Sequence, residues 1–370
     1  MSLDTNAVVA GALRDLAAVQ RSAQSRWGYK RAASAVARLE RQLPDLIGAD
    51  GVLPPISGIG PASTRVIVEV LASGWSETVE RAIAVSDKTD EIRTRRALRT
   101  HFLSRAEVLR ILQLDVPGVV SLADYRGDFQ MHSTWSDGVD SIADLAAAAV
   151  ARCYTHIAIT DHSKGLPIAR GMSVEAMAAQ AREIDAVNAD HAGAFRVLRG
   201  IETNISAAGE LDLTADELAG VEMVLAAPHS KLRTPDDQTA RLVRAVSIPE
   251  VHVLAHPRGR MSDSRPGVTA DWDDVFAAAV EHDVAIEIDG DPARQDLDYT
   301  YAHRALEAGC LFSLDSDAHD THALVYAETA LAHARLAGIP AERVINCWPL
   351  QRLLGWIGSK DGTDPRLAHN

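Results

Sequence analysis

Six short apolar runs, each ending on a His, Asp or Glu, dominate the hydrophobic pattern of the second two thirds of the chain. They span residues 128–132, 156–162, 195–202, 221–229, 251–256 and 311–319. Short runs rich in Val, Ile and Leu are typical of strands that are covered on both faces of a sheet. The pattern therefore predicts six buried strands.

Amphipathic stretches between these runs, at residues 141–152, 173–191 and 272–282, have the apolar spacing of helices. Strands that alternate with helices indicate a parallel α/β architecture. In a parallel barrel, the carboxyl ends of all strands open onto one face. The polar residues that end the runs should meet there as a metal site, and they are His132, His162, Glu202, His229, His256, Asp317 and His319.

The N-terminal part has a different pattern, which predicts helices at residues 8–19, 29–39 and 65–72 and a further helical pair at 88–113. The Pro117-Gly118 pair marks a linker. We therefore expect a helical domain over residues 1–120 and an α/β domain over residues 121–370. The arginines of the 88–113 pair are interpreted as a solvated basic face, and they are Arg93, Arg95, Arg96 and Arg99.

The turn Gly58-Ile59-Gly60 directly precedes the predicted 65–72 helix. A glycine-rich turn that opens a helix exposes backbone N–H groups at the positive helix end, which suits a phosphate oxygen. A tight helix–helix turn without any ligand explains the same residues equally well.

Composition indicates a protein without membrane contact. Of the 370 residues 47% are hydrophobic, and no apolar run reaches the roughly 20 residues of a membrane span. The net charge of −14 is uneven, because residues 1–120 carry 16 Lys and Arg against 13 Asp and Glu while the remainder is acidic. The widely spaced Cys153, Cys310 and Cys347 predict buried, reduced thiols in the cytoplasm.

Several motifs, in this order, resemble those of the PHP (polymerase and histidinol phosphatase) domain, especially the one that ends bacterial family-X DNA polymerases. The matching stretches are GDFQMHSTWSDG (127–138), IAITDHSK (157–164), RGIE (199–202), PHS (228–230), LAHPRGR (254–260) and DSDAH (315–319). The resemblance implies a distorted (β/α)7 barrel that holds two or three divalent metal ions.

The resemblance also distributes the ligands. One metal would take His132, Glu202 and Asp317, and a second would share Glu202 and add His229 and His256. The third would take Asp137, His162 and His319. These nitrogen and oxygen ligands suit Mn²⁺, Zn²⁺ or Fe²⁺. The family's first motif is usually His-x-His, and Gln130 stands at its first position, so the first metal is expected to bind more loosely.

Residues 6–85 resemble, more loosely, the small helix-hairpin-helix domain that opens the same polymerases. About forty residues join the two parts, which leaves no room for a nucleotidyl-transfer core. The family's helix after the hairpin carries a lysine that forms a Schiff base with an abasic sugar, but Val66 occupies that position. Because a Schiff base needs a deprotonatable amine, we expect no such lyase chemistry.

A metal cluster of this type suits hydrolysis of phosphate esters, with Glu202 as the bridging carboxylate. Developing phosphoryl charge needs cationic donors, for which Arg258, Arg260 and Lys164 are the main candidates on the loops after the strands. Arg170, Lys231 and Arg233 are further cations on those loops, where solvated charge explains them equally well.

Three hypotheses follow. The first is a phosphoesterase of DNA 3′ ends, either an exonuclease or a 3′-phosphatase, whose Gly58-Ile59-Gly60 turn contacts DNA. The second is a phosphatase of a small phosphomonoester such as histidinol phosphate. The third is a non-catalytic, metal-stabilised scaffold that binds DNA. The nearly complete ligand set disfavours the third, and oligomeric state is left open.

Overall fold

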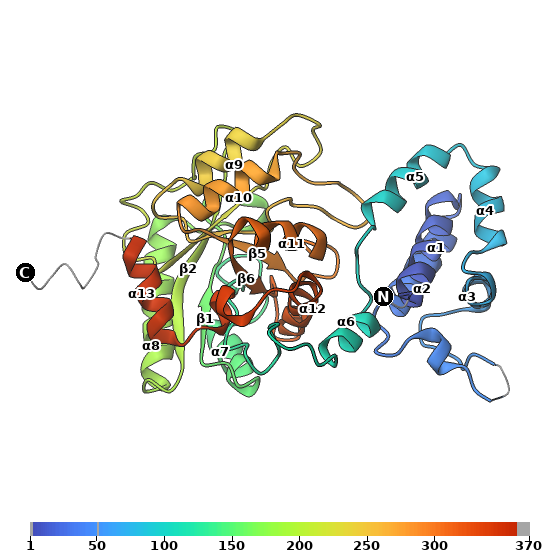
Figure 1. Cartoon of the computed structure of the whole chain (residues 1–370), viewed down its shortest axis with the longest axis horizontal. Coiled ribbons are helices and arrows are strands. Elements are labelled where there is room, and N and C mark those ends of the chain that lie inside the picture. Colours follow the sequence, from blue (N-terminus) through green and yellow to red (C-terminus); the bar gives the residue numbers. More distant parts are fainter. Residues whose placement is uncertain (1–2, 50–51, 361–370) are drawn as a thin grey trace, which may run out of the picture. The chain divides into compact units, whose positions relative to one another are not determined.

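The computed structural model describes residues 3–49 and 52–360, which form two compact units. The first unit comprises residues 1–114 with residues 262–264, and the second comprises the rest of the chain. The second unit is an α/β structure, and the first is helical. Each is described by itself below (Figure 1).

The first unit contains six α-helices among its described residues. They are α1 (Thr5–Val19), α2 (Ala23–Ala37), α3 (Pro61–Ser73), α4 (Glu77–Ala84), α5 (Thr89–Leu98) and α6 (Arg105–Leu112). The predicted helices at 8–19, 29–39 and 65–72 are confirmed, and each begins earlier than its apolar spacing suggests. The reason for α1 and α2 is side-chain capping: Asp4 accepts from the backbone N–H of Ala7, and Ser22 accepts from that of Ser25.

The predicted solvated basic face is found for Arg93, and Arg95 and Arg96 are partly exposed, whereas Arg99 is only 11% exposed. Arg93 and Arg95 form exposed ion pairs with Asp90 and Glu91. Arg96 and Arg99 instead both bind Asp15 of α1, whose side chain is only 2% exposed. These last two arginines are therefore structural, and they join α5 to α1 within the first unit.

The second unit is built on one parallel sheet of six strands in the order β1-β2-β3-β4-β5-β6. The strands are β1 (His156–Ile159), β2 (Arg196–Asn204), β3 (Met223–Ala227), β4 (Val253–Leu254), β5 (Ala285–Asp289) and β6 (Leu311–Asp315). Around the sheet lie α7 (Ile142–Ala151), α8 (Val174–Asp190), α9 (Thr239–Val246), α10 (Trp272–Glu281), α11 (Tyr299–Ala308), α12 (Ala327–Ala337) and α13 (Leu350–Lys360) (Figure 1). The predicted parallel α/β architecture is confirmed.

Residues 128–132 were expected to form the first strand, but they form no regular strand. Two of their amide groups bind side chains instead of a neighbouring strand, because Phe129 donates to Asp315 Oδ1 at 2.7 Å and Met131 donates to Thr160 Oγ1 at 3.0 Å. The segment is still hydrogen-bonded on both sides. Thr160 donates its N–H to the Met131 carbonyl at 2.9 Å, and His132 donates to that of Ala318 at 2.8 Å. It therefore bridges the region after β6 to β1.

Apolar side chains of the strands pack against those of the surrounding helices. One cluster joins Leu198, Leu225 and Val253 of the sheet to Trp356 and Ile357 of α13. Cys310 and Cys347 are buried as expected, whereas Cys153 is exposed because it follows the end of α7. The packed sheet holds the carboxyl ends of its strands in fixed positions, which is where the site lies.

Candidate metal centre

Glu202, on β2, is the centre of the site. Its side chain is inaccessible to solvent and four imidazoles surround it. The distances to its carboxylate oxygens are 2.9 Å from His256 Nε2, 3.1 Å from His162 Nδ1, 3.2 Å from His229 Nε2 and 3.5 Å from His132 Nε2. Parallel pairing of β1, β2, β3 and β4 brings these residues together, because each follows or ends one of these strands or the bridging segment.

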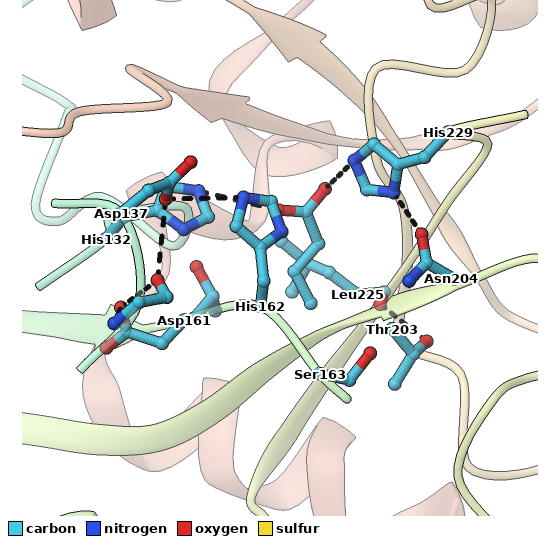
Figure 2. A network of polar contacts seen from close by, with 12 residues as sticks. His132, Asp137, Asp161, His162, Ser163, Thr203, Asn204, Leu225 and His229 are labelled. Carbon is cyan, nitrogen blue, oxygen red and sulfur yellow. Dashed lines mark hydrogen bonds and ion pairs between the residues drawn. The ribbon is translucent and has the colours of Figure 1, made fainter. Parts of the chain in front are cut away.

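Two aspartates extend the cluster from this centre. Asp317 Oδ1 lies 3.1 Å from His132 Nε2, and Asp137 Oδ1 lies 3.5 Å from His162 Nε2 and 3.4 Å from His319 Nε2. The structure thus brings together all eight residues that the sequence proposes as metal ligands. Figure 2 shows Asp137, His132, His162 and His229 converging from different segments.

The geometry groups the ligands differently from the expected distribution. One group, with ligand atoms all within 4.8 Å of one another, contains His132, Asp137, His162 and His319. A second contains His162, Glu202 and His229. His132 therefore lies with the set expected for the third metal, and His162 takes part in both groups.

Several ligand atoms fit a bound cation by their chemistry. His162 Nδ1, Glu202 Oε2 and His229 Nε2 are buried and accept no hydrogen bond from the described residues. Buried polar atoms normally have a partner, and three such atoms around one point are the arrangement that a divalent cation satisfies. The residues present therefore fit a metal centre.

Polar neighbours orient the ligands. Asn204 Oδ1 lies 2.5 Å from His229 Nδ1, which directs the Nε2 atom of that ring toward Glu202 (Figure 2). Asp161 accepts from the backbone N–H groups of Ser133 at 2.8 Å and Ser136 at 3.1 Å, and it thereby holds the turn that leads to Asp137. Such outer contacts fix the ring orientation and the tautomer of metal-binding imidazoles.

The backbone at two of the proposed ligands is strained. His256 has a φ of 26° and Asp317 has a φ of 52°, values in the left-handed region that non-glycine residues rarely adopt. Strained backbone of this kind clusters at functional sites, where the surrounding structure imposes it. Here it turns each side chain toward Glu202 or His132 immediately after its strand.

The charges of the cluster favour ionised carboxylates. Burial by itself would raise the pKa of Glu202, but the neighbouring His162 and His229 outweigh burial and hold that pKa well below its usual range. Burial lowers the pKa of His162 to about 4, so its ring is neutral at pH 7 and available as a ligand. The pKa of His319 is about 9, because Asp137 and Asp317 outweigh the effect of burial.

Gln130, which stands where the family motif has its first histidine, is fully buried. Its side-chain amide lies against the Glu287 carboxylate, and with the amide turned so that its nitrogen faces Oε2 the two groups form a hydrogen bond of 3.0 Å. Burial and the nearby Asp315 raise the pKa of Glu287 well above its usual range. Gln130 thus has a polar partner on β5.

The three cations expected to be catalytic form ion pairs with carboxylates outside the proposed ligand set. Arg258 and Arg260 both bind Asp298 Oδ2, at 3.3 and 3.1 Å, and Arg260 also donates to the carbonyls of Arg294 and Gln295. Lys164 pairs with Glu217 at 2.5 Å. These contacts hold loops around the site, and none joins these three residues to a proposed metal ligand.

Sequence reasoning missed Arg294 and the strand β5 that precedes it. Arg294 Nε lies 3.3 Å from Asp317 Oδ2 and 3.6 Å from Asp289 Oδ2. The signal in the sequence was an apolar run with acidic residues in alternate positions, Ala285-Ile-Glu-Ile-Asp289, which leads into the loop that carries the arginine.

Comparisons with known proteins relate the chain to phosphoesterases. It is 35% identical over 244 residues to the DNA polymerase/3′-5′ exonuclease PolX of Bacillus subtilis, and this match covers 66% of the chain and 43% of PolX. It is also 27% identical over 248 residues to the probable phosphatase YcdX of Escherichia coli, and this match covers 64% of the chain and 95% of YcdX. The matched region thus spans less than half of PolX and nearly all of YcdX. No family model matches the chain.

Among solved structures, histidinol phosphate phosphatase from Lactococcus lactis, complexed with zinc, L-histidinol and phosphate, aligns with a TM-score of 0.41 and 15% identity. The alignment covers 57% of this chain and 94% of that one.

The sequence relationships confirm the resemblance to the PHP-domain phosphoesterases that the motifs predict. The chain is thus similar to phosphoesterases, and it carries groups of His, Asp and Glu side chains that could hold metal ions. Among the described residues, no helix is both long enough and apolar enough to span a membrane.

Proposed function

We propose that the protein hydrolyses phosphate esters at the 3′ ends of DNA, as an exonuclease or a 3′-phosphatase, with two or three divalent metal ions held by the cluster around Glu202. The observation that carries the proposal is the convergence of four imidazoles on that one buried carboxylate. A relative named as a polymerase and 3′-5′ exonuclease supports DNA as the substrate.

The residues of the chain would divide the work as follows. One ion would lie among His132, Asp137, His162 and His319, and a second among His162, Glu202 and His229. Asp317 and His256, which contact His132 and Glu202, would complete the ligand set and could hold a third. When bound, such cations supply positive charge to the phosphoryl group and make water more acidic. Asn204 and Asp161 keep the ligands oriented, so that little reorganisation is needed during the reaction.

The helical unit offers a surface for single-stranded DNA. Trp27 of α2 is 65% exposed, and the guanidinium of Arg31 lies over its ring at 5.3 Å. The stem of Arg31 runs beside Gly58, where a turn closed by the Ile59 N–H and the Ile56 carbonyl at 3.1 Å leads into α3. Exposed aromatic rings beside cations stack on bases of any sequence, and backbone N–H groups at a helix start can contact a phosphate.

We expect Trp27→Ala to weaken binding of the full chain to 3′-ended single-stranded DNA by about tenfold, because stacking contributes roughly 1–3 kcal/mol per base. Affinity should also fall as salt rises, since phosphates release counterions on binding. Fluorescence anisotropy at low and physiological salt measures both effects. Trp75→Ala is the matched control, because Trp75 is 51% exposed and no cation–π contact involves it among the described residues.

Borohydride should trap no adduct of the protein with an abasic site. Val66 is fully buried in the core of the helical unit, so this position provides neither an amine nor access. Equal losses for the two tryptophan variants, or a trapped adduct, would contradict this account of the helical unit.

A small-molecule phosphatase is the second candidate, favoured by the nearly full-length match to the probable phosphatase YcdX. The deciding experiment compares manganese-loaded full-length protein on 3′-hydroxyl DNA, 3′-phosphorylated DNA, histidinol phosphate and nucleotides. We expect kcat/KM to be highest for one of the DNA substrates. A higher kcat/KM for histidinol phosphate would favour the small-molecule phosphatase. If no substrate were hydrolysed, the non-catalytic scaffold would be the hypothesis that remains.

A further inference from the structure

Arg294 lies on the loop between β5 and α11, beside the cluster but outside the ligand set. Its Nε atom faces Asp317 Oδ2 at 3.3 Å and Asp289 Oδ2 at 3.6 Å. Asp317 thus uses its two oxygens differently, since Oδ1 faces His132 Nε2 at 3.1 Å. The guanidinium group is therefore held beside the cluster by Asp317, which is itself a proposed metal ligand.

The rest of the guanidinium group remains available to a ligand. The Arg294 side chain is 21% exposed, and its ion pairs with Asp317 and Asp289 both approach through Nε rather than through the two terminal nitrogens. An arginine held through Nε keeps its planar fork fixed, and such a fork matches two oxygens of a phosphoryl group. Anchoring beforehand also reduces the side-chain entropy that is lost when a ligand binds.

The three cations that the sequence favours lack this combination. Arg258 and Arg260 share Asp298 as a partner, Arg260 is 5% exposed, and Arg258 also lies over the Tyr301 ring at 4.4 Å. Lys164 is paired with Glu217. Of these four cations, Arg294 is the one that contacts a proposed ligand, Asp317, through Nε and directs its terminal nitrogens elsewhere.

We propose that Arg294 contacts the phosphoryl group of the substrate through its terminal nitrogens and stabilises the charge that develops there. This inference rests on the proposed phosphoesterase function and identifies a catalytic residue for it. Fixed donors aimed at developing charge are among the strongest contributions to catalysis. The assignment replaces Arg258 and Arg260 as the main phosphoryl-binding cations.

The test uses inorganic phosphate, the tetrahedral product of monoester hydrolysis, and the metal-loaded full-length protein. Calorimetry gives the phosphate Kd of wild type, Arg294→Gln and Arg294→Lys, while elemental analysis gives the metal content of each. We expect Arg294→Gln to bind phosphate about tenfold or more weakly with unchanged metal content, because a charge-assisted bidentate contact is lost. Arg294→Lys should recover part of the loss, since it keeps the charge but not the fork.

Arg199→Gln is the matched control. Arg199 also pairs with an aspartate, Asp185, and its side chain is 34% exposed, but this pair involves β2 and α8 and no proposed ligand. This control should leave phosphate affinity within twofold of wild type.

Two outcomes would overturn the assignment. Phosphate affinity of Arg294→Gln within twofold of wild type would show that the fork does not bind phosphate. Loss of metal together with affinity would make Arg294 a positioning residue for Asp317. Failure of the proposed function has a different signature, because the wild type would then hydrolyse no phosphate ester whatever Arg294→Gln does to phosphate binding.

Discussion

Glu202→Gln should reduce phosphate ester hydrolysis by more than about a hundredfold. Loss of a residue that only supports a metal ligand already lowers metal affinity or activity by roughly 10–100-fold, and loss of a ligand itself should cost more. Four imidazole nitrogens lie within 3.5 Å of this carboxylate. A neutral amide of the same shape removes the charge that would hold two cations together, and it presents N–H donors toward some of these nitrogens. The fold should be unchanged, since the two side chains have nearly the same volume.

Steady-state kinetics with parallel elemental analysis checks this expectation. Glu281→Gln, on the exposed end of α10, removes the same charge away from the site and should leave both turnover and metal content unchanged. Turnover of Glu202→Gln close to wild type, at unchanged metal content, would show that Glu202 is not the bridge.

Asp15→Ala should destabilise the helical unit by about 1–3 kcal/mol, the cost of losing the partner of buried donors. The cost stays in this range because Arg99 is nearly buried, while Arg96 and Arg99 keep Glu80 and Asp263 as further partners. Asp15 is 2% exposed and accepts from Arg96 Nε at 2.6 Å and from Arg99. Its removal leaves two guanidinium groups without the carboxylate they share. Hydrogen exchange of peptides from α1 in the full-length protein reports the free energy of local opening, which should fall by this amount.

Asp90→Asn is the matched control for this measurement. Asp90 pairs with Arg93 on the same unit, but the side chains are 91% and 76% exposed. Exposed pairs of this kind contribute about 0–1 kcal/mol, so exchange in α1 should hardly change. Equal effects of the two substitutions would mean that Asp15 contributes no more than a surface charge.

The positions of the ligands could be predicted from the sequence because they depend on the backbone. An apolar run that ends on a polar residue predicts both the strand and the face on which the residue lies, as it does for His229 and His256 after β3 and β4. The strand β5 escaped this reasoning because Glu287 and Asp289 alternate with its apolar residues. Both are fully buried in the structure, where Glu287 contacts Gln130 and Asp289 contacts Arg294.

The partners of long charged side chains could not be predicted. Arg258 and Arg260 directly follow a ligand-bearing strand, and yet they bind Asp298, some forty residues later in the chain. Arg294, far from every recognised motif, reaches Asp317. A guanidinium group lies at the end of several rotatable bonds, so its contact depends on which loops pack beside it.

The grouping of the ligands depends on tertiary structure in the same way. The resemblance assigns His162 to one metal with Asp137 and His319, whereas its two ring nitrogens lie 3.5 Å from Asp137 and 3.1 Å from Glu202. One imidazole thus lies between the two groups of ligands. The sequence position of a histidine does not reveal which of its two nitrogens faces which neighbour.

The cluster around Glu202 should be a metal centre that holds more than one ion. The most direct measurement is elemental analysis of the full-length protein, stripped with chelator, reconstituted with manganese or zinc and freed of unbound metal. We expect two or three ions per chain for at least one of these metals. Less than one ion per chain with both metals would contradict the account.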